Sequence, residues 1–191
     1  MGKTGKFSVA GLKRLQSQLN RIQASDMDAF VESLARELAA RLLAKAIRRT
    51  PVGDYSKEIE VTAKRDSKYH KKGDVYKKRV NPSGKMGGTL RRGWISQTHE
   101  EASGGKGTVT AEKAREYADS MEIRREGNNL VIEIANPVYY AGYVEYGHRT
   151  PNHKGWVKGV FMLTISEQEL QEIAPKVLEA RIKQYLEGIM K

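Results

Sequence analysis

Two long stretches of the chain carry apolar residues at spacings of three and four, the pattern of an amphipathic helix. The first runs from Asp26 to Thr50, after Ser25, a favourable N-cap, and before Pro51, which pushes Thr50 out of helical geometry. Its apolar stripe comprises Met27, Phe30, Val31, Leu34, Leu38, Leu42 and Ile47. We expect four of these side chains to be buried against a C-terminal helix and a sheet: Phe30, Leu34, Leu38 and Leu42.

The second stretch lies near the C-terminal end of the sequence. Its apolar residues are Leu170, Ile173, Val177, Leu178, Ile182, Tyr185, Leu186 and Ile189. Ser166 and Glu169 match a capping box, which predicts that this helix begins at Ser166. Pro175 lies well inside the pattern and should kink or divide the helix. A shorter stripe over residues 7–22 predicts one more amphipathic helix.

Alternating apolar and polar residues between the long helices predict strands. Ser120–Ile123 and Leu130–Ala135 flank the polar turn Gly127-Asn128-Asn129, so they predict a β-hairpin. Asn136-Pro137 should end the second strand, because proline has no N–H to donate to the ladder. The other expected elements are a strand over residues 157–164, a short helix over 111–117, and loops over 100–110 and 150–155.

The segment after the hairpin, residues 138–147, predicts a short helix that Gly147 ends. It holds four tyrosines, Tyr139, Tyr140, Tyr143 and Tyr146. Two interpretations are open: core packing with the hydroxyls at the surface, or a subunit contact, where tyrosine is enriched. Tyr139, Tyr143 and Tyr146 cannot all share the helical face of Tyr140, so some of them should be exposed and covered by the next subunit. The polar rim of such a contact would consist of Glu145, His148 and Arg149.

Residues 54–86 are strongly basic. Between Tyr55 and Met86, ten basic residues face four acidic ones, an excess of six in a chain whose formal net charge is +11. Alternation around Ile59 and Val61 favours a two-stranded arm; the alternatives are a loosely ordered loop or a solvated charge run. The basic residues that we expect to contact protein or DNA are Lys64, Arg65, Lys68, Lys71, Lys72, Lys77, Lys78 and Arg79.

Composition sets further bounds. A length of 191 residues predicts a single domain, residues 1–191, with a real core. The absence of cysteine excludes disulfides and thiolate metal sites. No apolar run approaches the roughly 20 residues of a membrane span, so we expect no contact with a membrane. The positive net charge indicates a polyanionic partner, either nucleic acid or an acidic protein surface.

Motifs for catalysis and cofactor binding are missing from the sequence. The stretch Gly84-Lys85-Met86-Gly87-Gly88-Thr89 lacks the spacing of a phosphate-binding loop, and no G-x-S-x-G nucleophile elbow occurs. His148 and His153 are separated by a proline-containing loop with no carboxylate between them, which argues against a metal site. We therefore expect no catalytic residue, no cofactor, no metal and no enzymatic activity.

Four motifs, in a fixed order, carry a resemblance to a known family. They are Thr50-Pro51-Val52-Gly53, Gly88-Thr89-Leu90-Arg91-Arg92-Gly93-Trp94, Asn136-Pro137-Val138-Tyr139-Tyr140-Ala141 and Tyr143-Val144-Glu145-Tyr146-Gly147-His148-Arg149. Over residues 26–53 and 87–190 the chain resembles the head–tail joining proteins of tailed phages and prophages, the neck or tail-completion family. In that family the first two motifs are nearly contiguous. Residues 54–86 therefore represent an insertion at a surface loop, where added length costs little entropy.

The resemblance implies an α+β fold, in which a small antiparallel sheet packs against the long N-terminal helix and the C-terminal helix, with the basic insertion as an arm. It implies a structural virion protein, made in the bacterial cytoplasm, that forms a ring in the neck or upper tail and joins the capsid connector to the tail tube. The expected partners are other copies of the chain (sixfold, or twelvefold to match the portal), the connector and tail-tube or terminator proteins, and DNA in the channel. The alternative, based on charge, is a nucleic-acid-binding protein that uses residues 55–86.

Overall fold

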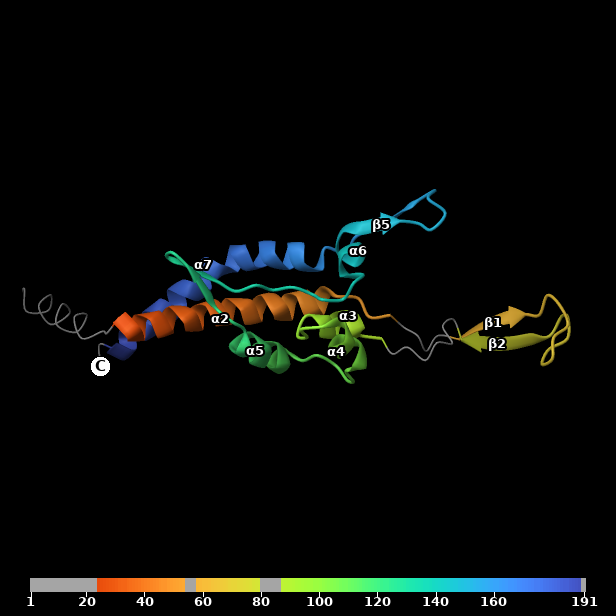
Figure 1. Cartoon of the computed structure of the whole chain (residues 1–191), viewed down its shortest axis with the longest axis horizontal. Coiled ribbons are helices and arrows are strands. Elements are labelled where there is room, and N and C mark those ends of the chain that lie inside the picture. Colours follow the sequence, from red (N-terminus) through yellow and green to blue (C-terminus); the bar gives the residue numbers. More distant parts are fainter. Residues whose placement is uncertain (1–23, 54–57, 80–86, 190–191) are drawn as a thin grey trace, which may run out of the picture. The chain divides into compact units, whose positions relative to one another are not determined.

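The computed structural model describes residues 24–53, 58–79 and 87–189 (Figure 1). Within these ranges, a long helix stands at each end of the sequence, and three separate two-stranded antiparallel sheets come between them along the chain. The expected α+β class is therefore confirmed, although its strands do not join into one sheet. The helix predicted over residues 7–22 lies outside the described residues.

The chain divides into two compact units. The first contains the described residues among 1–45, 111–134 and 163–191, and the second contains those among 46–110 and 135–162. Helix α2 (Ala24–Arg49) begins in the first unit and ends in the second. The two units therefore share this helix. The single domain expected over residues 1–191 stays a prediction.

Helix α2 confirms the first predicted helix. It begins at Ala24, so Ser25 lies inside the first turn and does not occupy the capping position that we expected. It ends at Arg49, and the N–H of Thr50 still donates to the carbonyl oxygen of Ala46 at 3.0 Å. The chain leaves the helix at the residue before Pro51, as predicted.

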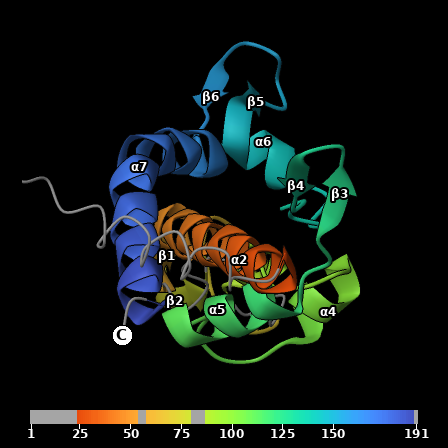
Figure 2. The same cartoon turned by 90° about the vertical axis from the view of Figure 1, so that its left-hand side faces the viewer.

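The buried side of α2 differs from the predicted stripe. Of the four side chains expected in the core, Leu34 is buried, whereas Phe30, Leu38 and Leu42 are only half-buried. The buried residues along the described part of the helix are Leu34, Ala39, Leu43, Ala46 and Ile47. The predicted burial was therefore wrong in degree for the other three, although Phe30 does contact the C-terminal helix α7 (Met162–Ile189) through Tyr185. Figure 2 shows α7 on one side of α2 and α5 (Ala111–Ser120) on another, so the buried residues do not follow a single stripe.

Helix α7 runs antiparallel to α2 in the first unit (Figures 1 and 2). Side-chain pairs between the two helices include Lys45–Glu169 at 2.7 Å, Glu37–Arg181 at 3.0 Å, and the stacked rings of Phe30 and Tyr185 at 4.0 Å between centroids. Ion pairs this exposed contribute little stability, so apolar contact holds the helices together. In the described ranges, neither these helices nor any other has the length and hydrophobicity needed to cross a membrane.

The start of α7 corrects two predictions. The helix begins at Met162, so the strand expected over residues 157–164 is confined to β6 (Trp156–Lys158). Ser166 is therefore a buried residue of the second helical turn and not an N-cap. Pro175 does not divide the helix, which continues to Ile189.

Helix α5 confirms the short helix predicted over residues 111–117. Carbonyl groups at its C-terminal end accept hydrogen bonds from Arg36 of α2, which donates to the carbonyl oxygens of Ala118 and Met121 at 3.1 and 2.8 Å. The predicted hairpin follows, with β3 (Arg124–Glu126) paired to β4 (Asn129–Val131). The strand positions were predicted less well: β3 begins only after the predicted first strand, Ser120–Ile123, has ended, and β4 stops at Val131, four residues before the predicted end.

The second unit holds short helices and hairpins. They are α3 (Thr89–Gly93), α4 (His99–Gly104) and α6 (Ala141–Tyr146), the pair β1 (Glu58–Thr62) and β2 (Val75–Arg79), and the pair β5 (Gly147–Arg149) and β6.

Helix α4 occupies part of the loop that was expected over residues 100–110. Thr98 Oγ1 accepts from the N–H of Glu101 at 3.2 Å, and Glu101 Oε2 accepts from the N–H of Gln97 at 2.8 Å, so side chains at both positions cap this helix.

The end of α6 is fixed by a distant segment. Gly147 ends the helix as predicted, with a φ of 87° that favours glycine. The N–H groups of Val160 and Phe161 donate to the carbonyl oxygens of Val144 and Glu145 at 2.8 and 3.0 Å. These bonds satisfy carbonyls that the helix end leaves free, and they hold the chain after β6 against α6.

Candidate assembly surfaces

Two of the four sequence motifs meet in a buried hydrogen-bonded cluster of the second unit. The hydroxyl of Thr50 donates to the carbonyl oxygen of Ala46 at 2.7 Å and accepts from the indole Nε1 of Trp94 at 2.7 Å. Arg91 Nε donates to the carbonyl oxygen of Thr50, also at 2.7 Å. Thr50 is completely buried and Trp94 nearly so. The motif residues therefore fix the end of α2 to α3.

Asn136 joins the third motif to this cluster. Its Nδ2 donates to the carbonyl oxygen of Leu90 at 2.9 Å, and its Oδ1 accepts from the N–H of Val138 at 3.2 Å. A Cβ atom on Gly93 would overlap Asn136 Oδ1, so glycine permits this close approach. The cluster thus holds the chain that leads into the tyrosine segment. The residues of the cluster position this segment and are themselves largely buried.

We expect Thr50→Val to lower the free energy of unfolding of the second unit by about 1–3 kcal/mol, because valine keeps the shape but leaves the Trp94 N–H buried without an acceptor. Denaturant unfolding followed by tryptophan fluorescence, in a Trp156→Phe background that leaves Trp94 as the single emitter, measures this loss. The same substitution at the exposed Thr62 is the matched control and should change stability by less than about 0.5 kcal/mol. Equal effects at the two positions would contradict the role of the Thr50 hydroxyl.

The tyrosine segment presents three exposed rings. Tyr139, Tyr143 and Tyr146 are 76%, 60% and 66% exposed, whereas Tyr140 is half-buried and Val138 is buried. Val138 and Tyr140 therefore face the core, and the other three tyrosines face solvent, as the helical spacing predicts. Three exposed tyrosines within eight residues make this segment a candidate contact surface, because tyrosine is enriched where proteins meet.

The hairpin β5–β6 adds exposed apolar side chains that the sequence analysis did not select. Trp156 is 62% exposed and Val157 is 45% exposed. The indole of Trp156 lies against Gly147 at the end of α6, where a Cβ atom would come within 2.9 Å of Nε1. We call Tyr139, Tyr143, Tyr146, Trp156 and Val157 the aromatic surface. A signal for Trp156 was present, since tryptophan is enriched where proteins meet and this one directly follows an expected loop.

The three residues expected at the rim of this surface differ in their placement. Arg149 is exposed, and His148 is half-buried with its ring in edge contact with Tyr143 at 5.9 Å. Glu145 is only 6% exposed, so it offers a neighbouring subunit almost no area. The role of these residues as a polar rim stays a prediction.

The two-stranded interpretation of the basic insertion is confirmed. Strands β1 and β2 pair antiparallel from Glu58 opposite Arg79 to Thr62 opposite Val75. Seven of the eight predicted contact residues have exposed side chains: Lys64, Arg65, Lys68, Lys71, Lys72, Lys77 and Lys78. The eighth, Arg79, is the last residue of β2.

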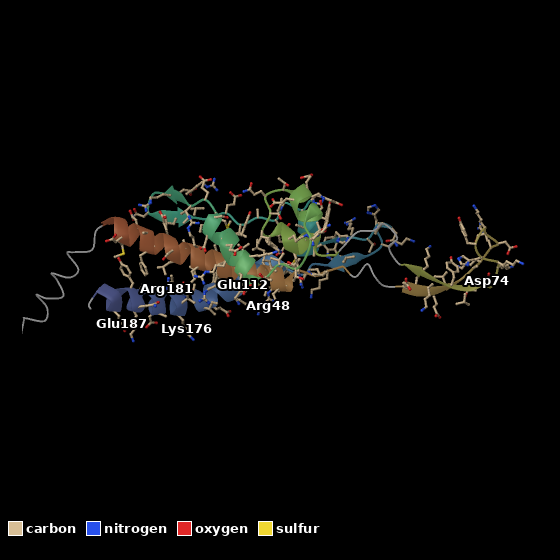
Figure 3. The ribbon with its side chains drawn as sticks, turned by 90° about the horizontal axis from the view of Figure 1, so that it is seen from below. Arg48, Asp74, Glu112, Lys176, Arg181 and Glu187 are labelled. Carbon is tan, nitrogen blue, oxygen red and sulfur yellow. The ribbon has the colours of Figure 1, made fainter. Side chains whose placement is uncertain are left out.

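A second apolar surface lies on α7 in the first unit. Pro175, Leu178, Ile182 and Leu186 line a shallow depression of about 580 Å³, and their spacing places them on one side of the helix. Ile182 and Leu186 are exposed. We call these four residues the α7 face. Charged residues border it, among them Glu187, which Figure 3 labels on the outer side of the helix.

In the part of the chain that the structure describes, no three histidine, aspartate or glutamate side chains come together in a way that could hold a metal ion. The features that stand out are therefore surfaces for contact: the aromatic surface, the α7 face and the basic hairpin.

Comparison with known proteins gives one family. The family model described as "Bacteriophage HK97-gp10, putative tail-component" matches residues 13–147, which is most of the chain and includes the basic insertion and the aromatic segment of α6. No curated protein and no solved structure matches the chain.

Proposed function

Because this chain belongs to the HK97-gp10-like family of bacteriophage tail components, and is thus a structural protein of the phage particle, we propose that it forms a ring in the neck or upper tail that joins the capsid connector to the tail tube. The observation that carries the proposal is the aromatic surface. Three tyrosines, a tryptophan and a valine are exposed on one unit of a single subunit, and tyrosine and tryptophan are the residues most enriched where proteins meet.

A head-to-tail ring requires two different surfaces on every subunit, because each copy contacts the next through unlike patches. The chain exposes two apolar surfaces of different character, the aromatic surface and the α7 face. We assign the α7 face as the counterpart that receives the aromatic surface of the neighbouring copy. The charged residues beside each surface, such as Arg149 and Glu187, would then form the polar rim of the contact.

A ring between two coaxial tubes must follow their axial symmetry. A sixfold ring matches a tail tube, and a twelvefold ring matches the portal. Connector proteins would bind one end of the ring and tail-tube or terminator proteins the other.

Quantitative mass spectrometry of purified particles tests this function. We expect six or twelve copies of the chain for each particle in which head and tail are joined. A protein that is absent from joined particles, or present as one copy, cannot form the proposed ring.

A further inference from the structure

The loop between β1 and β2 is ordered by its own acidic side chains. The N–H of Lys72 donates to Asp66 Oδ1 at 2.7 Å, and the N–H of Lys71 donates to Asp74 Oδ2 at 2.8 Å. The backbone of Ala63 and Asp74 closes the loop at 2.8 Å. Figure 3 labels Asp74 in this loop. Both aspartate side chains therefore accept hydrogen bonds from the backbone of the loop.

Positive charge is also concentrated in the loop, where five basic residues outnumber the two aspartates. In the stem of the hairpin, acidic and basic residues stand opposite one another, as Glu60 does to Lys77. In the loop, five basic side chains are exposed: Lys64, Arg65, Lys68, Lys71 and Lys72. Among the described residues, no ion pair joins any of these five to a carboxylate. We call these five residues the basic tip.

The composition of the loop favours nucleic acid over protein as the partner. A protein interface has an apolar centre and is depleted in lysine. The loop offers one large exposed side chain, Tyr69, at 78% exposure, with Lys68 Nζ at 5.7 Å from its ring centroid. Phosphate contacts need no apolar centre, since binding comes from the release of counterions by lysine and arginine.

The form of nucleic acid follows from the same residues. Proteins that bind single strands stack successive bases on several aromatic rings. Here one ring is exposed, because His70 is already stacked on Tyr76 at 3.9 Å. A two-stranded ribbon, by contrast, fits the major groove of duplex DNA. The loop carries no asparagine or glutamine to read base edges.

We propose that the basic tip binds the phosphate backbone of double-stranded DNA without sequence preference. This activity goes beyond a structural role in a ring, and it does not depend on ring formation.

Fluorescence anisotropy of the full-length protein with a short duplex, at salt concentrations from 50 to 300 mM, tests this proposal. We expect the same affinity for unrelated sequences and a log–log salt slope of about −4.5, since each of five phosphate contacts contributes about 0.9. Lys68→Gln/Lys71→Gln/Lys72→Gln should make the slope shallower by about 2.7 and weaken binding at 50 mM at least ~10-fold. The charge-preserving Lys68→Arg/Lys71→Arg/Lys72→Arg should bind as the wild type does.

The matched control removes the same charge elsewhere, as Lys154→Gln/Lys176→Gln/Lys183→Gln, and should leave the slope within about 1 of the wild-type value. Four results would each overturn the proposal. They are no binding to duplex DNA at 50 mM salt, an unchanged slope in the triple glutamine variant of the tip, an equal loss in the control variant, and tighter binding to single-stranded DNA or to poly-glutamate than to the duplex.

Discussion

Replacing Leu43 with alanine is expected to lower the free energy of unfolding by about 2–5 kcal/mol. Leu43 lies in α2 with none of its side-chain surface exposed, and it is among the largest completely buried side chains of the described residues. Alanine would remove the apolar contacts and leave a cavity that the surrounding helices can only partly fill. Denaturant unfolding with linear extrapolation gives the difference between the two proteins.

Leu38→Ala is the matched control, five residues away on the same helix. Leu38 is half-buried, so its truncation should cost less than half as much as that of Leu43. If Leu38→Ala proved as costly as Leu43→Ala, the stripe that the sequence indicates would be the true core, and the burial described for α2 would be incorrect.

Removing the aromatic surface is expected to abolish the joining of heads to tails while leaving the subunit folded. The variant Tyr139→Ala/Tyr143→Ala/Tyr146→Ala removes three exposed rings. Exposed substitutions of this kind change stability by about 0.5 kcal/mol or less each. Central aromatic residues of an interface contribute about 2 kcal/mol or more each, so the joint loss should prevent assembly. Complementation of a phage that lacks the protein measures this failure of assembly as a loss of infectious particles.

Two controls make this result specific. Tyr139→Phe/Tyr143→Phe/Tyr146→Phe keeps the buried area and should restore most of the infectious yield. Tyr69→Ala removes an equally exposed tyrosine from the basic hairpin and should not affect the contact between subunits. A triple alanine variant that assembles as well as the wild type would show that these rings face solvent in the particle.

The sequence was most informative where local chemistry decides the structure. Pro51 ends α2 and Gly147 ends α6, because proline restricts the residue before it and glycine accepts a positive φ. The Gly127 turn likewise predicted the hairpin β3–β4, although its first strand begins later than expected. Helix α4 was missed although its signal was present, since Thr98 and Glu101 have the spacing of a capping box.

Distant contacts account for what the sequence could not predict. Residues 159–161 lie within the strand expected over 157–164, yet the N–H groups of Val160 and Phe161 bond to the end of α6. A Cβ atom on Gly159 would overlap the carbonyl oxygen of Glu145, so this contact also requires glycine. The burial of Leu43 similarly depends on which helices cover α2, and a periodic pattern on one helix does not contain that information.

The candidate surfaces were predictable to different degrees. Helical spacing separated Tyr143 and Tyr146 from Tyr140, and charge counting located the basic hairpin. The sequence did not reveal that Asp66 and Asp74 bind the backbone of the loop, nor that Trp156 lies beside the end of α6. Both facts depend on how the chain turns, and they change which residues are available to a partner.

A symmetry-resolved electron cryomicroscopy reconstruction of the neck of the assembled particle tests the proposed ring most directly. We expect a closed ring of six or twelve copies between connector and tail tube, in which each copy covers Tyr139, Tyr143 and Tyr146 of its neighbour with its α7 face. A reconstruction that places a single copy in the particle, or that leaves these three tyrosines far from any other chain, would contradict the account.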